Sequence, residues 1–115
     1  MAFGDVLYAN LPGPSGHEQA GTRPAILVQA DEDDARLNTR TVIPVTRNKN
    51  ALRYPGTLLV QPSSGNGLKE PSVLLVSGIT TLDRTKVGGK VGILDKRDIK
   101  ALRKALRRFL QIDDD

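Results

Sequence analysis

The chain has 115 residues, contains no cysteine, and carries a formal net charge of +4 at pH 7 with a pI of about 9.7. This length predicts one domain over residues 1–115, and the composition excludes disulfides and thiolate metal sites and suits the cytoplasm. The basic balance favours a polyanionic partner such as nucleic acid, and no apolar run approaches the roughly 20 residues that cross a bilayer, so we expect neither a secretory signal nor a membrane anchor.

Most of the chain is predicted to form short strands separated by breakers. Alternating or continuous apolar runs that are rich in β-branched residues indicate strands, and clusters of proline, glycine and serine end them. The expected strands are residues 5–11, 24–29, 39–46, 57–61, 72–82 and 90–94. Four consecutive acids at 31–34 predict a solvated turn, residues 62–69 a flexible loop, and the glycines at 88 and 89 a turn.

The end of the chain predicts an amphipathic helix from Asp95 to Gln111. Asp95 is a good N-cap residue, and apolar residues recur at steps of three and four. The apolar stripe comprises Ile99, Leu102, Leu106 and Phe109, and seven lysines and arginines cover the other faces. Residues 113–115 are expected to fray, since three aspartates are unfavourable at a helix C-terminus. Short strands followed by one helix predict a mainly β fold, a small antiparallel barrel or half-barrel with a helix packed on it.

The richest polar segment is residues 16–24, GHEQAGTRP, directly before an apolar strand. Arg23 suits an anionic ligand because its planar fork binds phosphate oxygens bidentately, and Pro24 pushes Arg23 toward an extended backbone. His17 titrates near neutrality and is able to move a proton. A solvated arginine before a strand and a histidine in a turn without a catalytic role stay open as alternatives.

A second candidate is the strand end IPVTRN at residues 43–48, where Thr46 offers a hydroxyl to a phosphate. An ordinary threonine at a strand end is the alternative. A metal site is not expected. The chain has a single histidine, and the consecutive carboxylates at 31–34 point in different directions without the spacing of a calcium loop. No G-x-S-x-G elbow suggests a serine nucleophile, and we predict no cofactor.

Together these segments resemble the MazF/PemK/Kid family, the toxins of type II toxin–antitoxin modules. The similarity begins with GDVL at residues 4–7 and is strongest in GHEQAGTRP, which is similar to the family's G-x-E-Q-x-G-x-R-P signature. It continues in VIPVT at 42–46, similar to a strand ending in P-[IV]-T, and in PSVL at 71–74 and TLDR at 81–84. It covers nearly the whole chain, from Gly4 to Leu110.

The resemblance implies an SH3-like barrel with a C-terminal helix that acts as a homodimer. It implies a metal-independent endoribonuclease that cuts single-stranded RNA, usually mRNA, and a cognate MazE-like antitoxin that blocks the site. Carried over by position, the catalytic arginine is Arg23 and the threonine is Thr46. His17 contributes as acid or base, and Glu18 orients or tunes it or Arg23. Further candidates for RNA contact are Gln19, Thr22, Arg47, Lys49, Ser77 and Thr80.

The chain departs from the family's pattern in the segment 75–83, LVSGITTLD. Thr80 takes the place of an arginine, and Ser77 lies where an acid or amide is common, so roles given to those positions in relatives do not carry over. Arg47 and Lys49 are the expected substitutes for phosphate contacts. With only two tyrosines and two phenylalanines, base stacking would rest on hydrogen bonds, arginine planes or Tyr54.

Two other functions remain open at this point. One is a toxin of the CcdB type, which shares the barrel and poisons a gyrase–DNA complex without cutting RNA. The other is a basic RNA-binding module with a weak or absent catalytic site. The cations of the C-terminal helix form either a solvated face or a contact for nucleic acid or antitoxin.

Overall fold

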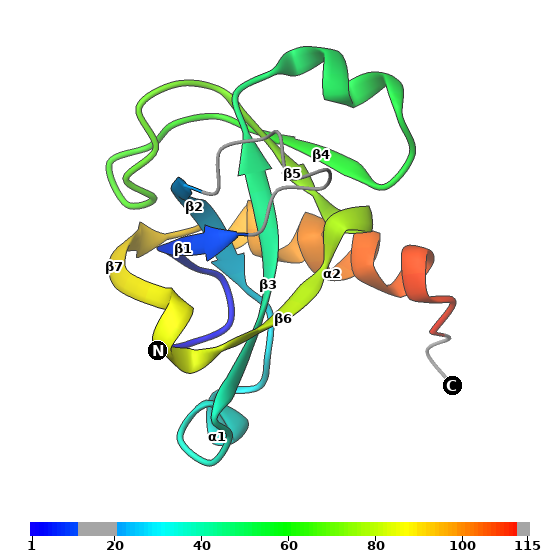
Figure 1. Ribbon diagram of the computed structural model, residues 1–115. Coiled ribbons are helices and arrows are strands. Elements are labelled where there is room, and N and C mark those ends of the chain that lie inside the picture. Colours follow the sequence, from blue (N-terminus) through cyan, green and yellow to red (C-terminus); the bar gives the residue numbers. More distant parts are fainter. Residues whose placement is uncertain (12–20, 113–115) are drawn as a thin grey trace.

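The computed structural model describes residues 1–11 and 21–112 of the chain (Figure 1). Within these residues, seven strands and two α-helices follow one another with three short 3-10 turns between them. The strands are β1 Asp5–Leu11, β2 Gly21–Leu27, β3 Thr39–Thr46, β4 Thr57–Val60, β5 Ser72–Leu75, β6 Thr80–Asp83 and β7 Val87–Ile93. The helices are α1 Asp31–Asp34 and α2 Lys96–Leu110, and the 3-10 turns are η1 Lys49–Arg53, η2 Val76–Gly78 and η3 Arg84–Lys86.

The strands form one antiparallel sheet in the order β4-β5-β3-β2-β1-β7, with β6 pairing with β3. The long strand β3 is the hub. It pairs with β2 along one edge, and with β6 and then β5 along the other. The predicted class, mainly β with a C-terminal helix, is confirmed. The barrel is open, because β4 and β7 lie at the two ends of the strand order in the described part of the chain.

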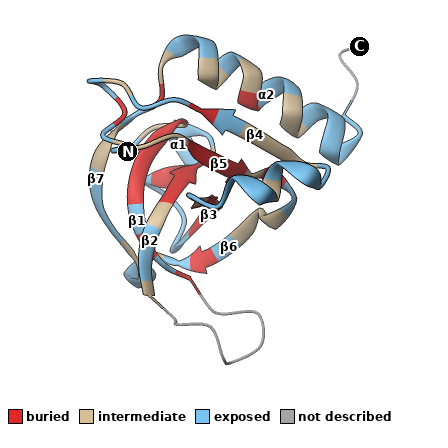
Figure 2. Cartoon of the chain, turned by 90° about the horizontal axis from the view of Figure 1, so that it is seen from above, coloured by how far each residue is buried: buried red, intermediate tan, exposed pale blue. Residues whose placement is uncertain are grey.

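Buried residues, red in Figure 2, lie along the strands and form two clusters, one of which includes Leu102 of α2. Successive side chains of a strand point to opposite faces of the sheet. Neighbouring residues of one strand therefore enter different clusters: Val6 packs with Ile26, Ile43 and Leu74, whereas Leu7 packs with Leu27, Val42 and Leu82. Of the strand predicted at 24–29, residues 25–27 are wholly buried and residues 24, 28 and 29 are partly buried. Each fully buried leucine or isoleucine contributes about 1.5–3 kcal/mol relative to an exposed one.

Helix α2 lies against the sheet near β4 and η2, with its predicted stripe turned inward (Figures 1 and 2). Leu102 is fully buried, and Ile99 and Leu106 pack partly buried on the first cluster. Phe109 is 44% exposed, so the stripe extends beyond the part that the sheet covers.

The two ends of α2 are formed in different ways. Asp95 occupies the N-cap position, but its carboxylate accepts a hydrogen bond from Ser63 Oγ (2.8 Å) and caps no helical N–H. Gln111 ends the helix in a left-handed conformation, φ 54°.

Three local predictions were wrong. The expected strand 72–82 is broken by η2, and β7 runs through Gly88 and Gly89 instead of turning there. The acidic turn forms α1, and its last residue, Asp34, is buried.

The segment predicted as a loop, residues 62–69, contains no helix or strand. It is built around Asn66, a fully buried amide that accepts hydrogen bonds from the backbone N–H of Ser63 and Leu68.

The expected fraying of residues 113–115 concerns positions outside the described part of the chain. Within the described residues, no helix has both the length and the apolar character needed to cross a membrane.

Candidate active site

The ends of β2 and β3 bring two of the predicted residues together. In the paired part of these strands Ala25 lies opposite Pro44, and the same register continued by two residues places Arg23 opposite Thr46. The paired part of β2 and β3 ends at Ala25 and Pro44, and Thr46 is held from the other edge of β3, where it pairs with Val73 of β5. Arg23 and Thr46 line one open hollow of about 340 Å³, together with Pro44, Val45, Asn48, Asn50, Ala51, Tyr54 and Leu75.

Arg23 presents an exposed cation to this hollow. Its backbone is held in β2 opposite Ala9 of β1, so the base of the side chain is fixed by the sheet. Its guanidinium forms no hydrogen bond or ion pair with any residue that the structure describes, whereas buried or partly buried arginines elsewhere do. A guanidinium without an internal partner retains all its donors for an anionic ligand.

Thr46 contributes a hydroxyl whose orientation is set by the chain that follows it. Its Oγ1 accepts a hydrogen bond from the backbone N–H of Asn48 (3.2 Å), so the hydroxyl proton stays available to donate. Asn48 in turn accepts from the backbone N–H of Asn50 through Oδ1 (3.0 Å) and caps η1. These two local bonds start the turn that carries Asn50 and Tyr54 to the hollow.

Five other predicted site residues in the described part of the chain do not line this hollow. Arg47 is exposed, forms an ion pair with Glu70 (3.5 Å), and lines a separate hollow of about 100 Å³ with Lys69. Lys49 is exposed on η1, Ser77 is exposed on η2, and Thr80 lies on β6 opposite Val42. Thr22 is exposed beside Arg23, on the opposite face of β2 by strand alternation. The predictions for His17, Glu18 and Gln19 fall outside the described residues.

Sequence reasoning missed the contribution of the η1 segment to the hollow. Asn48 was considered only as part of the strand end at 43–48, Tyr54 only as a candidate for base stacking, and Asn50 not at all. The signal available was the spacing of Asn48 and Asn50, since asparagine often accepts a hydrogen bond from the backbone two residues on and begins a turn.

Within residues 1–11 and 21–112, no group of three or more His, Cys, Asp or Glu side chains comes together as a metal site.

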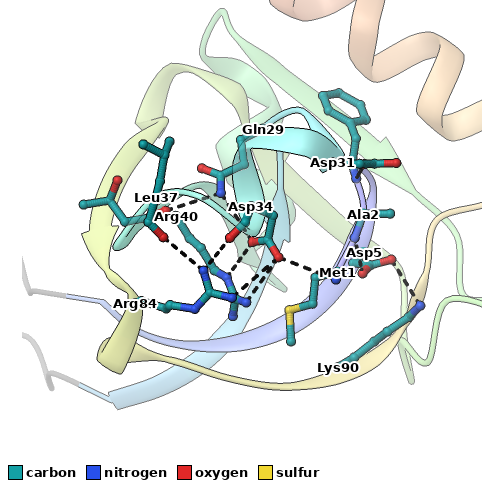
Figure 3. A network of polar contacts seen from close by, with 12 residues as sticks. Met1, Ala2, Asp5, Gln29, Asp31, Asp34, Leu37, Arg40, Arg84 and Lys90 are labelled. Atoms are coloured by element: carbon teal, nitrogen blue, oxygen red, sulfur yellow. Dashed lines mark hydrogen bonds and ion pairs between the residues drawn. The ribbon is translucent and has the colours of Figure 1, made fainter.

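A second polar cluster lies at the other end of β3, around the buried carboxylate of Asp34 (Figure 3). Arg40 donates to it through Nε (2.8 Å) and Nη2 (3.4 Å), and Gln29 through Nε2 (3.4 Å). Arg84 lies 3.8 Å from Asp34 Oδ2, and its Nη1 donates to the backbone carbonyls of Asp34 and Leu37. Burial raises the pKa of Asp34, but the hydrogen bond and charge of Arg40, aided by the Met1 amino group and Arg84, outweigh burial and hold the pKa below 3.8.

A family model described as the PemK-like, MazF-like toxin of type II toxin-antitoxin systems matches residues 2–110. The chain belongs to this family. It is 30% identical over 109 residues to the endoribonuclease MazF6 of Mycobacterium tuberculosis, covering 94% of this chain and 95% of the relative. It is also 30% identical over 106 residues to the endoribonuclease MazF of Staphylococcus saprophyticus, covering 92% of this chain and 88% of that protein.

The fold of this MazF-like chain agrees with solved structures. A mycobacterial endoribonuclease in complex with its cognate antitoxin superimposes with a TM-score of 0.77 at 16% identity, covering 100% of this chain and 99% of that one. MazF of Deinococcus radiodurans superimposes with a TM-score of 0.74 at 23% identity, covering 97% of each chain. The family prediction made from the sequence is therefore confirmed, and the two strand ends that carry Arg23 and Thr46 lie in the part that the family model covers.

Proposed function

We propose that this MazF-like toxin is an endoribonuclease that cleaves single-stranded RNA at the hollow lined by Arg23 and Thr46. The observation that carries the proposal is that one open hollow is lined by the guanidinium of Arg23, which has no partner among the described residues, and by the hydroxyl of Thr46, whose proton is available to donate. The support from relatives is that two proteins 30% identical over nearly the full chain are endoribonucleases.

RNA brings its own nucleophile, the 2′-hydroxyl, so the protein needs no nucleophilic side chain. Attack of the 2′-oxygen on the adjacent phosphorus forms a new P–O bond, and the bond to the 5′-oxygen of the next nucleotide breaks. The products are a 2′,3′-cyclic phosphate and a 5′-hydroxyl. Negative charge accumulates on the non-bridging oxygens in the transition state, and Arg23 is placed to stabilise it. Thr46 donates its hydroxyl proton to a phosphate oxygen and orients the scissile group.

Two protons must move in this reaction, one from the 2′-hydroxyl and one to the departing 5′-oxygen. A guanidinium holds its proton too tightly to serve easily as the base. We assign this work to His17, whose ordinary pKa lies near neutrality, with Glu18 orienting or tuning it or Arg23. Gln19 and Thr22 follow in the same segment as candidates for RNA contact.

In the cell such an activity would cut mRNA and so stop translation and growth. The proposed partners are a cognate antitoxin that blocks the hollow and a second copy of the chain in a homodimer, and the proposed location is the cytoplasm. A solved mycobacterial relative is seen with its cognate antitoxin, which supports the first of these partners.

The test is digestion of a long RNA by the purified protein in EDTA, with every new end mapped and its chemistry determined. Cyclic phosphate and 5′-hydroxyl ends at a short recurring sequence are the expected result. RNA that is bound but left intact would favour the non-catalytic binding module, and RNA neither bound nor cut would favour the CcdB-type toxin.

A further inference from the structure

We propose that the groove between α2 and residues 54–58 binds the stretch of single-stranded RNA next to the cleaved bond. In this groove Tyr54 stacks on a base of the bound RNA, and Lys104 and Arg108 contact its phosphates. The proposal rests on the proposed RNA cleavage at the hollow of Arg23 and Thr46, and it names where the strand continues.

The groove adjoins the cleavage hollow. It has a volume of about 630 Å³ and is lined on one side by residues 54–58 and on the other by α2. Tyr54 lines both spaces, and it is the most exposed large hydrophobic side chain of the described residues, at 68%. A strand of RNA that leaves Thr46 along η1 therefore meets the tyrosine ring before it reaches the helix.

The backbone of Tyr54 is held at two points, which makes the ring a stable platform. Its N–H donates to the carbonyl of Ala51 (3.1 Å), and its own carbonyl accepts from Thr57 Oγ1 (3.0 Å). An aromatic ring that is fixed at its base and exposed at its faces is suited to stacking, and every base offers a face to it. This contact is therefore independent of base identity.

The charge of the groove complements a phosphate backbone. Lys104 and Arg108 lie four residues apart, so both project from one side of α2, and both are exposed. Within the described part of the chain neither forms an ion pair, and no acidic side chain lines the groove. Ala101 and Ala105 also line the groove, and their small side chains leave space between the cations and the tyrosine.

These features favour RNA over a protein segment as the occupant. The groove combines two cations that have no ion-pair partner among the described residues with the exposed rings of Tyr54 and Phe109, and it is continuous with the proposed cleavage hollow. Proteins use this combination to follow a single strand. An extended RNA then gains affinity from the groove that a short RNA, ending at the cleaved bond, does not gain.

The experiment compares two RNAs that contain the mapped cleavage sequence, one trimmed to it and one extended in both directions. Binding is measured on versions with a 2′-deoxy nucleotide at the cleaved position, so that binding is read without cleavage. The test variant is Lys104→Ala/Arg108→Ala. The matched control is Lys96→Ala/Lys100→Ala, which removes the same charge from α2 at residues that line a different hollow.

In the test variant we expect the advantage of the extended RNA over the trimmed RNA to shrink. The slope of log K against log salt for the extended RNA should also fall by roughly 1.4, the value for two lost phosphate contacts on a single strand. The control should keep both quantities at the wild-type values. Tyr54→Leu should weaken binding of the extended RNA by about 5- to 150-fold, and Tyr54→Phe, which keeps the ring, should restore it.

The proposal is overturned if the test variant and the control respond alike, or if Tyr54→Leu binds extended RNA as the wild type does. It is also overturned if the test variant keeps wild-type RNA binding but loses self-association or binding of an antitoxin peptide, since the groove would then hold protein. Melting temperatures equal to the wild type show that the variants are folded. A wild-type protein that neither cuts nor binds RNA would instead contradict the proposed function itself.

Discussion

Two arginines on neighbouring strands show how differently the same side chain is used at the two ends of β3. Arg40, near the end where α1 lies in Figure 1, is 7% exposed and is held by Asp34 through two hydrogen bonds. Arg23, beside the opposite end, is exposed and has no partner among the described residues. Removing one partner of a buried ion pair is costly because the other charge is left buried without a counter-ion, whereas an exposed guanidinium with no partner among the described residues has its donors free for a ligand.

The largest effect on folding is expected at the Asp34 cluster. Asp34→Ala leaves the Arg40 guanidinium buried without its anion, and the free energy of unfolding should fall by about 3 kcal/mol. Urea unfolding of the two proteins measures the difference. RNA cleavage by the folded fraction should remain, because the cluster lies at the far end of β3.

Asp33→Ala is the control for Asp34→Ala. It removes the same group one position earlier in α1, where the residue is exposed, and should change the free energy of unfolding by less than about 0.5 kcal/mol. Equal destabilisation by the two substitutions would show that the Asp34–Arg40 pair has no special part in the fold.

A smaller effect is expected from Thr46, this time on activity. Thr46→Val keeps the shape of the side chain and removes the hydroxyl, so cleavage should slow by about 12- to 160-fold, the value of one hydrogen bond to a charged group. Thr46→Ser should recover most of the rate, since the serine hydroxyl can accept from the Asn48 N–H and donate in the same way. Initial rates on a labelled RNA measure this. A valine variant with the wild-type rate would remove Thr46 from the site.

The smallest effect is the pH dependence of stability that Asp34 imposes. Its pKa in the folded protein is lowered from 3.8, so the folded state holds the ionised form more strongly than the unfolded chain does. The resulting stability is present above pH 3.8 and is lost as the pH falls through the lower, folded value. The difference in unfolding free energy between wild type and Asp34→Asn should therefore be constant near neutrality and shrink in acid. A difference that grew in acid would contradict this sign.

The sequence predicted the elements whose patterns are local. The bounds of β1 and β3 follow from alternation and from the breakers beside them, and α2 from its three- and four-residue apolar spacing. The joining of Arg23 to Thr46 was also predicted, through the family's motifs. The roles of His17, Glu18 and Gln19 stay predictions.

What the sequence could not predict depends on contacts between distant segments. Asp34 is one of four similar acids, and only the register of β3 decides that it, rather than its neighbours, meets Arg40. The composition of the segment around Asn66 is polar and predicts a flexible loop. The burial of the Asn66 amide among backbone groups, among them the carbonyl of Gln61 to which it donates (2.9 Å), is not encoded in that composition. The break at η2 arises because the chain moves from pairing at one end of β3 to pairing at the other, and no short pattern encodes that change of position.

The most direct test of the central assignment is the cleavage rate of Arg23→Ala beside that of Asp34→Ala, each with its unfolding free energy. Loss of the guanidinium should reduce the rate by about 10²- to 10³-fold, the usual cost of one donor to a developing oxyanion, and leave stability unchanged because Arg23 is exposed. Asp34→Ala should do the reverse. An Arg23→Ala protein that is fully folded and cuts RNA at the wild-type rate would contradict the account.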